Sequence, residues 1–245
     1  MRSGLALLAL LWLVLPVQAA DVSGLDWEQS PGAAVPMDVP LVDADGAATT
    51  LRMVAGGHPL ILAPGYFKCP NLCGVIRDDL FAALALSKHP KAQVALLTID
   101  PVEGSADARA VRAGVLDRYP EARFAALTGP ESSLLAIAQA SGFHARFDPA
   151  ARQLLHPAGI VILTPSGHVS SYLLGVGYAA QDLDAALADA QAGAFRRAEP
   201  IHLFCFSYDP ATGRLTATVM EAVRIGGVLT VLAIAALLLL LGRRA

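Results

Sequence analysis

The sequence predicts an α/β fold in which a mixed β-sheet is flanked by helices, with one transmembrane helix added at the C-terminus. From residue 60 onward, short apolar runs alternate with stretches in which apolar residues recur at helical spacing. The chain has 245 residues, which suits one domain of ordinary size with additions. Hydrophobic residues make up 55% of the chain and charged residues 16%, and the apolar excess is concentrated in two end segments.

The two ends of the chain predict export and a membrane anchor. Residues 1–19 have the parts of a signal peptide: Arg2 precedes an apolar run, Pro16 interrupts it, and small residues follow near Ala19. An uncleaved N-terminal anchor is the alternative. Residues 225–241 carry no charge, would span about 25 Å as a helix, and favour a transmembrane helix over a buried core helix. Since arginines follow this segment, we expect the inner (cytoplasmic) membrane of a bacterium, with the soluble domain in the periplasm and the C-terminus in the cytoplasm.

The part of the chain between these ends divides where its pattern changes. Residues 20–58 form an N-terminal extension with a hairpin that turns at Asp45-Gly46, residues 59–192 form the main domain, and residues 193–224 form a membrane-proximal hairpin. The formal net charge of −3 argues against a nucleic-acid partner. Within the main domain we expect strands at 60–63, 93–99, 124–127, 159–163 and 168–173, and helices at 74–87, 105–119 (capped by Ser105), 131–140 and 181–190.

Each of these elements has its own pattern. The strand at 60–63 is a run of four apolar residues, and the longer run at 93–99 is typical of a strand buried on both faces. The helices at 74–87 and 181–190 place apolar residues four apart on one face. Pro165-Ser166-Gly167 supplies the turn between the last two strands.

A pair of cysteines lies where the first core strand meets the next helix. If Cys69 is the N-cap and Pro70 the first helical residue, both Cys69 and Cys73 lie at the helix N-terminus, where the dipole and unpaired N–H groups favour thiolates. Thiolates perform disulfide exchange and bind soft metals such as Cu(I). A structural disulfide is the alternative, but such a short loop would remove little chain entropy.

A third metal ligand would have to come from one of the six histidines. His156 precedes the strand at 159–163, which should lie beside the strand at 60–63, so its loop can face the cysteines. From spacing alone His156 is either a ligand or a hydrogen-bonded loop histidine. The other five are expected in solvated loops, at strand edges or in the membrane-proximal hairpin: His58, His89, His144, His168 and His202.

Four motifs in order along the chain resemble those of the SCO/SenC family. They are residues 65–73 (GYFKCPNLC), 98–101 (TIDP), 127–129 (LTG) and His156. Members of this family are thioredoxin-fold, membrane-tethered copper proteins implicated in assembling the dicopper centre of cytochrome c oxidase. The similarity extends from about residue 39 to residue 190.

This resemblance implies a thioredoxin-like sheet and a copper site. Carried over residue by residue, the metal ligands are Cys69, Cys73 and His156, the metal is copper as Cu(I) or Cu(II), and the partner is a copper-accepting oxidase subunit or another copper chaperone. The family usually has its membrane anchor at the N-terminus, not the C-terminus. Family members also usually have proline after the second cysteine and often have Asp and Ser around the histidine, in place of Gly74, Leu155 and Pro157.

Two functions remain open at this stage. A copper chaperone needs all three ligands, because two thiolates rarely complete a metal site. A thiol–disulfide oxidoreductase would use Cys69 and Cys73 as a redox pair to reduce an exported partner, without carrying copper and without needing His156. The sequence leaves open whether the chain is an enzyme.

Three nearby residues have two interpretations each. Lys68 either favours a thiolate at the neighbouring cysteine or is a solvated loop lysine. Asp100 is either an acceptor close to the site or a residue that forms a turn. Cys205 is either a buried apolar cysteine or a thiol that reacts with a partner.

Overall fold

The computed structural model of the chain describes residues 27–69, 73–89, 92–148, 153–198, 225–232 and 234. Two compact units are present: Val22–Cys205, and a second unit made of Met1–Asp21 and Phe206–Ala245. In chain order, the helices and strands of the first unit are β1 (Leu41–Val42), β2 (Ala48–Thr49), α2 (Leu51–Ala55), β3 (Leu60–Gly65), α3 (Cys73–Leu86), β4 (Gln93–Thr98), α4 (Ser105–Arg118), β5 (Ala125–Leu127), α5 (Glu131–Ala140), β6 (Arg146–Asp148), β7 (Gln153–Leu155), β8 (Gly159–Leu163), β9 (Val169–Leu174) and α6 (Ala180–Gln191).

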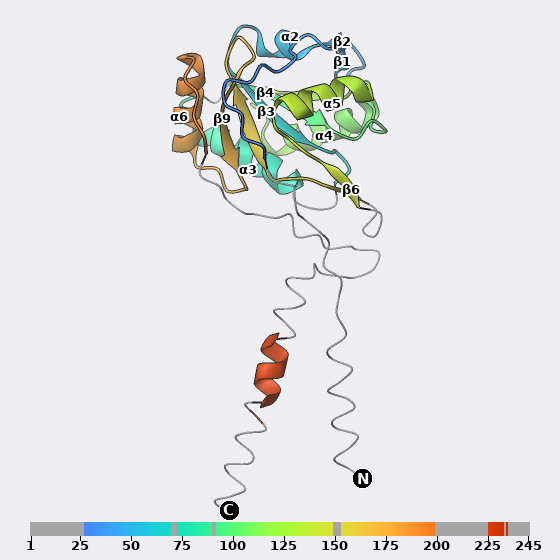
Figure 1. The fold of residues 1–245 in the computed structure, drawn as a ribbon. Coiled ribbons are helices and arrows are strands. Elements are labelled where there is room, and N and C mark those ends of the chain that lie inside the picture. Colours follow the sequence, from blue (N-terminus) through green and yellow to red (C-terminus); the bar gives the residue numbers. More distant parts are fainter. Residues whose placement is uncertain are drawn as a thin grey trace, which may run out of the picture. The chain divides into compact units, whose positions relative to one another are not determined.

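A five-stranded mixed sheet in the order β5-β4-β3-β8-β9 forms the centre of this unit (Figure 1). The strands β3, β4 and β5 run parallel, whereas β8 pairs antiparallel with both β3 and β9. The predicted mixed sheet with flanking helices is therefore confirmed, including the predicted contact between the strands that begin at Leu60 and Gly159.

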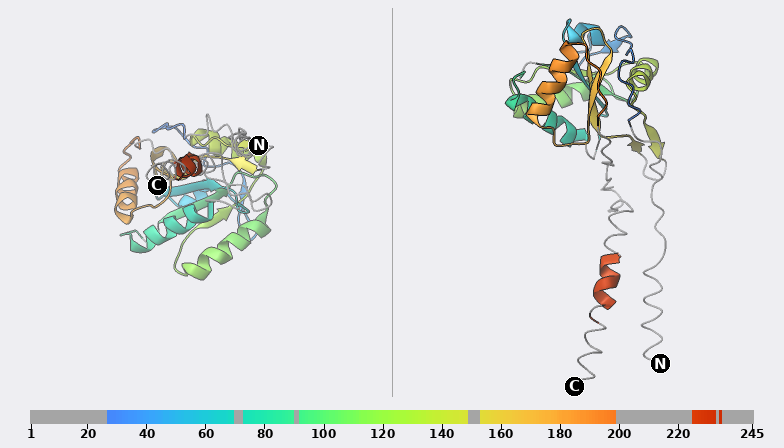
Figure 2. Two further views of the ribbon diagram at one scale, coloured as in Figure 1. Left: turned by 90° about the horizontal axis from the view of Figure 1, so that it is seen from below. Right: turned by 60° about the vertical axis from the view of Figure 1, so that its left-hand side comes forward.

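The sheet is covered on both faces because its central strand is apolar on both. Along β3, Leu60 and Leu62 join one buried cluster, which includes residues of α5 and of the N-terminal extension. Ile61 and Ala63 join the other cluster, which includes residues of α3 and α6. The right-hand view of Figure 2 shows α6 and α5 on opposite sides of the sheet.

The N-terminal extension contains the predicted hairpin. Strands β1 and β2 pair antiparallel around the Asp45-Gly46 turn, and Gly46 has a φ of 84°. The Asp43 carboxylate accepts hydrogen bonds from the backbone N–H groups of Asp45 and Ala47, which closes the turn. The extension and the main domain belong to one compact unit.

Three features differ from the sequence-based expectation. Helix α4 has Gly104 as its N-cap, not Ser105, and the Gly104 N–H donates to the carboxylate of Asp107 at 3.0 Å. Helix α2 and the small β6–β7 hairpin were not predicted. Both are short: α2 has five residues, and each strand of the hairpin has three.

Of the second unit, the structure describes a short helical stretch at residues 225–232. No helix in the described part of the chain is both long and apolar enough to cross a membrane. The predicted signal peptide (1–19), residues 199–224 of the predicted hairpin with Cys205 and His202, and residues 233 and 235–241 of the predicted span lie outside the described residues.

Candidate metal centre

Both motif cysteines lie beyond the carboxyl end of β3. Cys73 is the first residue of α3 and only 4% of it is exposed, whereas Cys69, in the preceding loop, is partly exposed. Residues 70–72 lie outside the described residues, so the predicted N-cap role of Cys69 stays a prediction.

His156 meets Cys73 across the strand pair that forms the middle of the sheet. Because β8 runs antiparallel to β3, the loop that precedes β8 lies next to the end of β3. The His156 ring is placed there, with Nε2 3.4 Å from the Sγ of Cys73, and only 5% of the residue is exposed. Two of the three predicted ligands are therefore in contact.

A contact with the backbone fixes the tautomer of His156 and thus which ring nitrogen presents its lone pair to the sulfur of Cys73. Nδ1 lies 3.0 Å from the carbonyl oxygen of Pro157. A carbonyl oxygen only accepts, so Nδ1 carries the hydrogen, and in the neutral ring Nε2 is left with its lone pair towards Cys73. Histidines that bind metals commonly donate their second N–H to such a carbonyl or carboxylate. The ring is thus held in the tautomer that a metal ligand requires.

The spacing of these two atoms suits a shared metal ion. Bonds of about 2.3 Å to sulfur and about 2.0 Å to nitrogen, as at zinc, would span 3.4 Å at an angle of roughly 105°. Among the described residues, however, no group of three or more His, Cys, Asp or Glu side chains is gathered closely enough to hold a metal. The role of Cys69 as the third ligand therefore stays a prediction.

Aromatic rings hold His156 on two sides. Tyr66 meets the imidazole edge-on at 5.7 Å between ring centroids, and Phe143 lies against it at 5.3 Å. Phe143 is in turn packed by Trp27, whose indole N–H donates to the carbonyl of Ala158 at 3.1 Å. The N-terminal extension thus supports the loop that carries the histidine.

A buried carboxylate holds the loop that leads to Cys69. Glu103, of which only 3% is exposed, accepts hydrogen bonds from the backbone N–H groups of Phe67 and Lys68, both at 2.7 Å. It also accepts one from the hydroxyl of Thr98 at the end of β4. Sequence reasoning missed Glu103, because an acidic residue just before a helix is usually solvated. The available clue was that parallel β3 and β4 must end side by side.

Two residues that the sequence left open have local partners. The ammonium of Lys68 lies 3.3 Å from the carboxylate of Asp107, and the Lys68 side chain is 61% exposed. The Gly104 N–H and, to a smaller extent, Lys68 hold the pKa of Asp107 below its usual value. The carboxylate of Asp100 accepts from the Val102 N–H at 2.9 Å, which fits the turn-forming interpretation.

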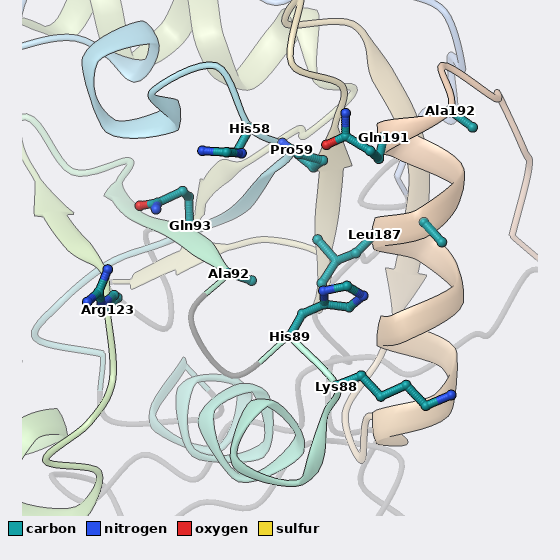
Figure 3. Close-up of a pocket in the computed structure, with 11 residues that line it drawn as sticks. His58, Pro59, Lys88, His89, Ala92, Gln93, Arg123, Leu187, Gln191 and Ala192 are labelled. Atoms are coloured by element: carbon teal, nitrogen blue, oxygen red, sulfur yellow. The ribbon is translucent and has the colours of Figure 1, made fainter.

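Two hollows in the described surface differ in volume, and the larger one lies away from the cysteines. A small cavity of about 20 Å³ adjoins Cys73, enough for one group the size of a water molecule. A much larger hollow, of about 840 Å³, lies at the opposite end of the parallel strands (Figure 3). Its lining includes His58, Lys88, His89 and Arg123 and no cysteine, so the thiol chemistry lies elsewhere.

Comparison with known proteins identifies one family. The model of the SCO1/SenC family matches residues 28–192. A search of curated proteins finds no match.

Solved structures with the same fold are numerous. A protein of Aquifex aeolicus VF5 is 25% identical, with a TM-score of 0.59, covering 66% of this chain and 95% of that one. Arabidopsis thaliana ScoI, solved with copper bound, is 16% identical with a TM-score of 0.52, covering 64% and 97%. BsSco, a member of the Sco family of cytochrome c oxidase assembly proteins in which a disulfide switch was identified, is 17% identical with a TM-score of 0.53, covering 68% and 99%. The fold is therefore the thioredoxin-like fold of these proteins.

Proposed function

Because the chain belongs to the SCO1/SenC family, we propose that it carries copper for the assembly of cytochrome c oxidase and holds the ion through Cys69, Cys73 and His156. The observation that carries this proposal is the 3.4 Å contact between the Sγ of Cys73 and Nε2 of His156, two residues 83 positions apart in the chain. The copper-bound structure of Arabidopsis thaliana ScoI, which has the same fold, supports the choice of metal.

The chemistry of the donor set agrees with a copper cargo. Thiolate sulfurs are soft ligands that select Cu(I), and imidazole suits copper in either oxidation state. Copper would be bound by the two sulfurs, once both thiols have lost their protons, together with Nε2 of His156. Since Cys69 is partly exposed, an acceptor can reach the ion from that side and exchange ligands with it.

Copper titration of the full-length protein tests the ligand set. We expect the reduced protein in detergent to bind about one Cu(I) in competition with a chromogenic chelator. Loss of a residue that merely orients a ligand weakens metal affinity by about 10–100-fold. Replacing a ligand itself, as in C69S, C73S or H156A, should therefore weaken affinity by at least about 100-fold.

The matched control is His89→Ala, which removes an exposed histidine from the hollow at the other end of the sheet. This variant should bind copper like the original chain. Unchanged affinity in H156A, or loss of affinity in H89A, would contradict the proposed site.

The membrane anchor and the location are part of the proposal. We propose that residues 225–241 tether the domain to the inner membrane after cleavage of residues 1–19, with the domain in the periplasm, where a copper-accepting oxidase subunit or another copper chaperone receives the ion. The uncharged C-terminal run and its flanking arginines support this topology. Protease added to spheroplasts should digest the domain, and protection from protease would contradict the topology.

A thiol–disulfide exchange activity is the second candidate, and the unequal exposure of the cysteines favours it. Cys69 is partly exposed, whereas Cys73, four residues later in the sequence, is buried. Cys69 would attack a partner disulfide, and Cys73 would then attack the mixed disulfide. The partner leaves with two thiols, and this chain keeps the disulfide.

A further inference from the structure

The loop between β3 and Cys69 is attached to the neighbouring strand at several points. The Ile99 N–H donates to the Gly65 carbonyl at 2.7 Å, at the point where β3 and β4 end together. Directly after it, Glu103 accepts the N–H groups of Phe67 and Lys68. The loop is therefore held by successive hydrogen bonds up to the residue before Cys69.

Glu103 is suited to hold this loop because both of its carboxylate oxygens accept hydrogen bonds. Oε1 accepts from Lys68 N, and Oε2 accepts from Phe67 N and from the Thr98 hydroxyl. Hydrogen bonds to a carboxylate are stronger than those between neutral groups. Since a buried charge that loses its partners is strongly destabilising, the carboxylate and the loop hold each other in place.

We propose that Glu103 is a positioning residue for Cys69: it fixes the backbone at Phe67 and Lys68 and thereby sets the place from which Cys69 serves as a ligand together with Cys73 and His156. This inference rests on the proposed copper function. A ligand on a loop that is already fixed loses less conformational freedom when copper binds than a ligand on a loose loop, so the fixed loop gives tighter binding. Glu103 itself need not touch the metal.

Glu103→Gln is the informative substitution, because glutamine has nearly the same shape but only one accepting oxygen. If the oxygen of the glutamine side chain keeps the hydrogen bonds from the Phe67 N–H and the Thr98 hydroxyl, its NH₂ group faces the Lys68 N–H. Both of these groups are donors, so the hydrogen bond to Lys68 is lost. We expect E103Q to raise the Cu(I) dissociation constant at least tenfold and to speed amide hydrogen exchange at Phe67 and Lys68. Glu121→Gln, the same change at an exposed position, should stay within twofold of the original chain.

A folded E103Q protein with copper affinity within twofold of the original chain would overturn the proposal. Should E103Q fail to fold, Glu103→Asp takes its place. This variant keeps the charge, but its side chain is one methylene shorter and cannot reach both N–H groups, and we expect at least a threefold weakening. A smaller effect overturns the proposal in the same way.

A second measurement separates this inference from the proposed function. If the original chain binds no copper, the copper function fails, and Glu103 is judged by the equilibrium of Cys69 and Cys73 with glutathione. Two protein thiols and one glutathione disulfide give one protein disulfide and two glutathione thiols. Because E103Q loosens the backbone next to Cys69, we expect it to change this equilibrium constant at least fivefold. An unchanged equilibrium constant overturns the proposal.

Discussion

His156 obtains a ligand's geometry from its own backbone neighbours. In the SCO/SenC motif an acidic residue often precedes the histidine, and this chain has Leu155 there. The structure supplies an acceptor one residue later, because the Pro157 carbonyl takes the Nδ1 hydrogen at 3.0 Å. Since proline has no backbone N–H, this carbonyl belongs to a residue with no donor of its own. Leucine in place of the acidic residue at position 155 therefore does not remove the acceptor that fixes the tautomer of His156.

Substitution of the same residue separates the two candidate functions. His156→Ala removes the imidazole but leaves the thiols of Cys69 and Cys73, so disulfide exchange should proceed at a rate within about threefold of the original chain while tight copper binding is lost. The measurement is the rate of reduction of a disulfide-bonded peptide by the reduced protein, with Cys69→Ser as the inactive control. A parallel loss of both activities in H156A would contradict the separation.

At the scale of elements, the end of α3 is held to α6 by one carboxylate. Asp184 accepts from the Ser87 hydroxyl at 2.5 Å and from the Lys88 N–H at 3.0 Å. The Ser87 hydroxyl is the main cause that lowers the pKa of Asp184 from its usual value near 3.8, and the Lys88 N–H adds to it. The ionised form thus contributes to the stability of the fold.

The pH dependence of stability should follow from this contact. A group whose pKa is lower in the folded state stabilises the fold above the unfolded value, near 3.8 for Asp184, and its contribution is lost as the pH falls through the folded value. The urea midpoint of Asp184→Asn should therefore lie below that of the original chain at pH 7, and the difference should shrink at pH 3. Asp182→Asn, at an exposed position of the same helix, is the control, and a gap in D184N that is independent of pH would contradict the mechanism.

At the scale of the whole molecule, the N-terminal extension is part of the domain. The Glu28 N–H donates to the carbonyl of Gly142 at 2.9 Å, and Gly142 has a φ of +75°, which disfavours a side chain there. A Cβ at this position would lie 2.0 Å from the carbonyl oxygen of Glu28. The chain can therefore come this close only to a glycine.

Gly142→Ala should weaken the attachment of the extension. A left-handed conformation alone destabilises a non-glycine residue by about 1–2 kcal/mol, and the contact with Glu28 adds to this. We expect G142A to lower the free energy of unfolding by at least about 2 kcal/mol more than Gly46→Ala, which has a φ of +84° with nothing within 4 Å of its Cβ. Denaturant unfolding of the two variants checks this, and equal losses would contradict it.

Long apolar elements of the fold were predictable from the sequence. The helix at 131–140 has the predicted bounds. The strands that begin at Leu60, Gln93 and Gly159 also start where expected, because the apolar runs of these strands are continuous and end in turn residues. The β6–β7 hairpin was not predictable, since strands of three residues with an exposed Phe147 show no alternation.

The candidate site was predictable in part for the same reason. The expected pairing of the strand after His156 with the strand before the cysteines predicts that His156 lies near them, and the structure places its ring against Cys73. The pairing of Glu103 with the loop at Phe67 and Lys68 depends instead on how two loops meet in space. No local pattern in the sequence encodes such a contact.

The antiparallel pairing of β3 with β8 has a consequence for the order of events during synthesis. A ribosome must have released the chain well past Leu163 before that strand can dock beside Leu62, and only then do sulfur and imidazole meet. If Cys73 and His156 are the proposed ligands, a partly synthesised polypeptide has no complete coordination sphere with which to capture copper. Under the proposed function, copper loading therefore follows a nearly finished fold.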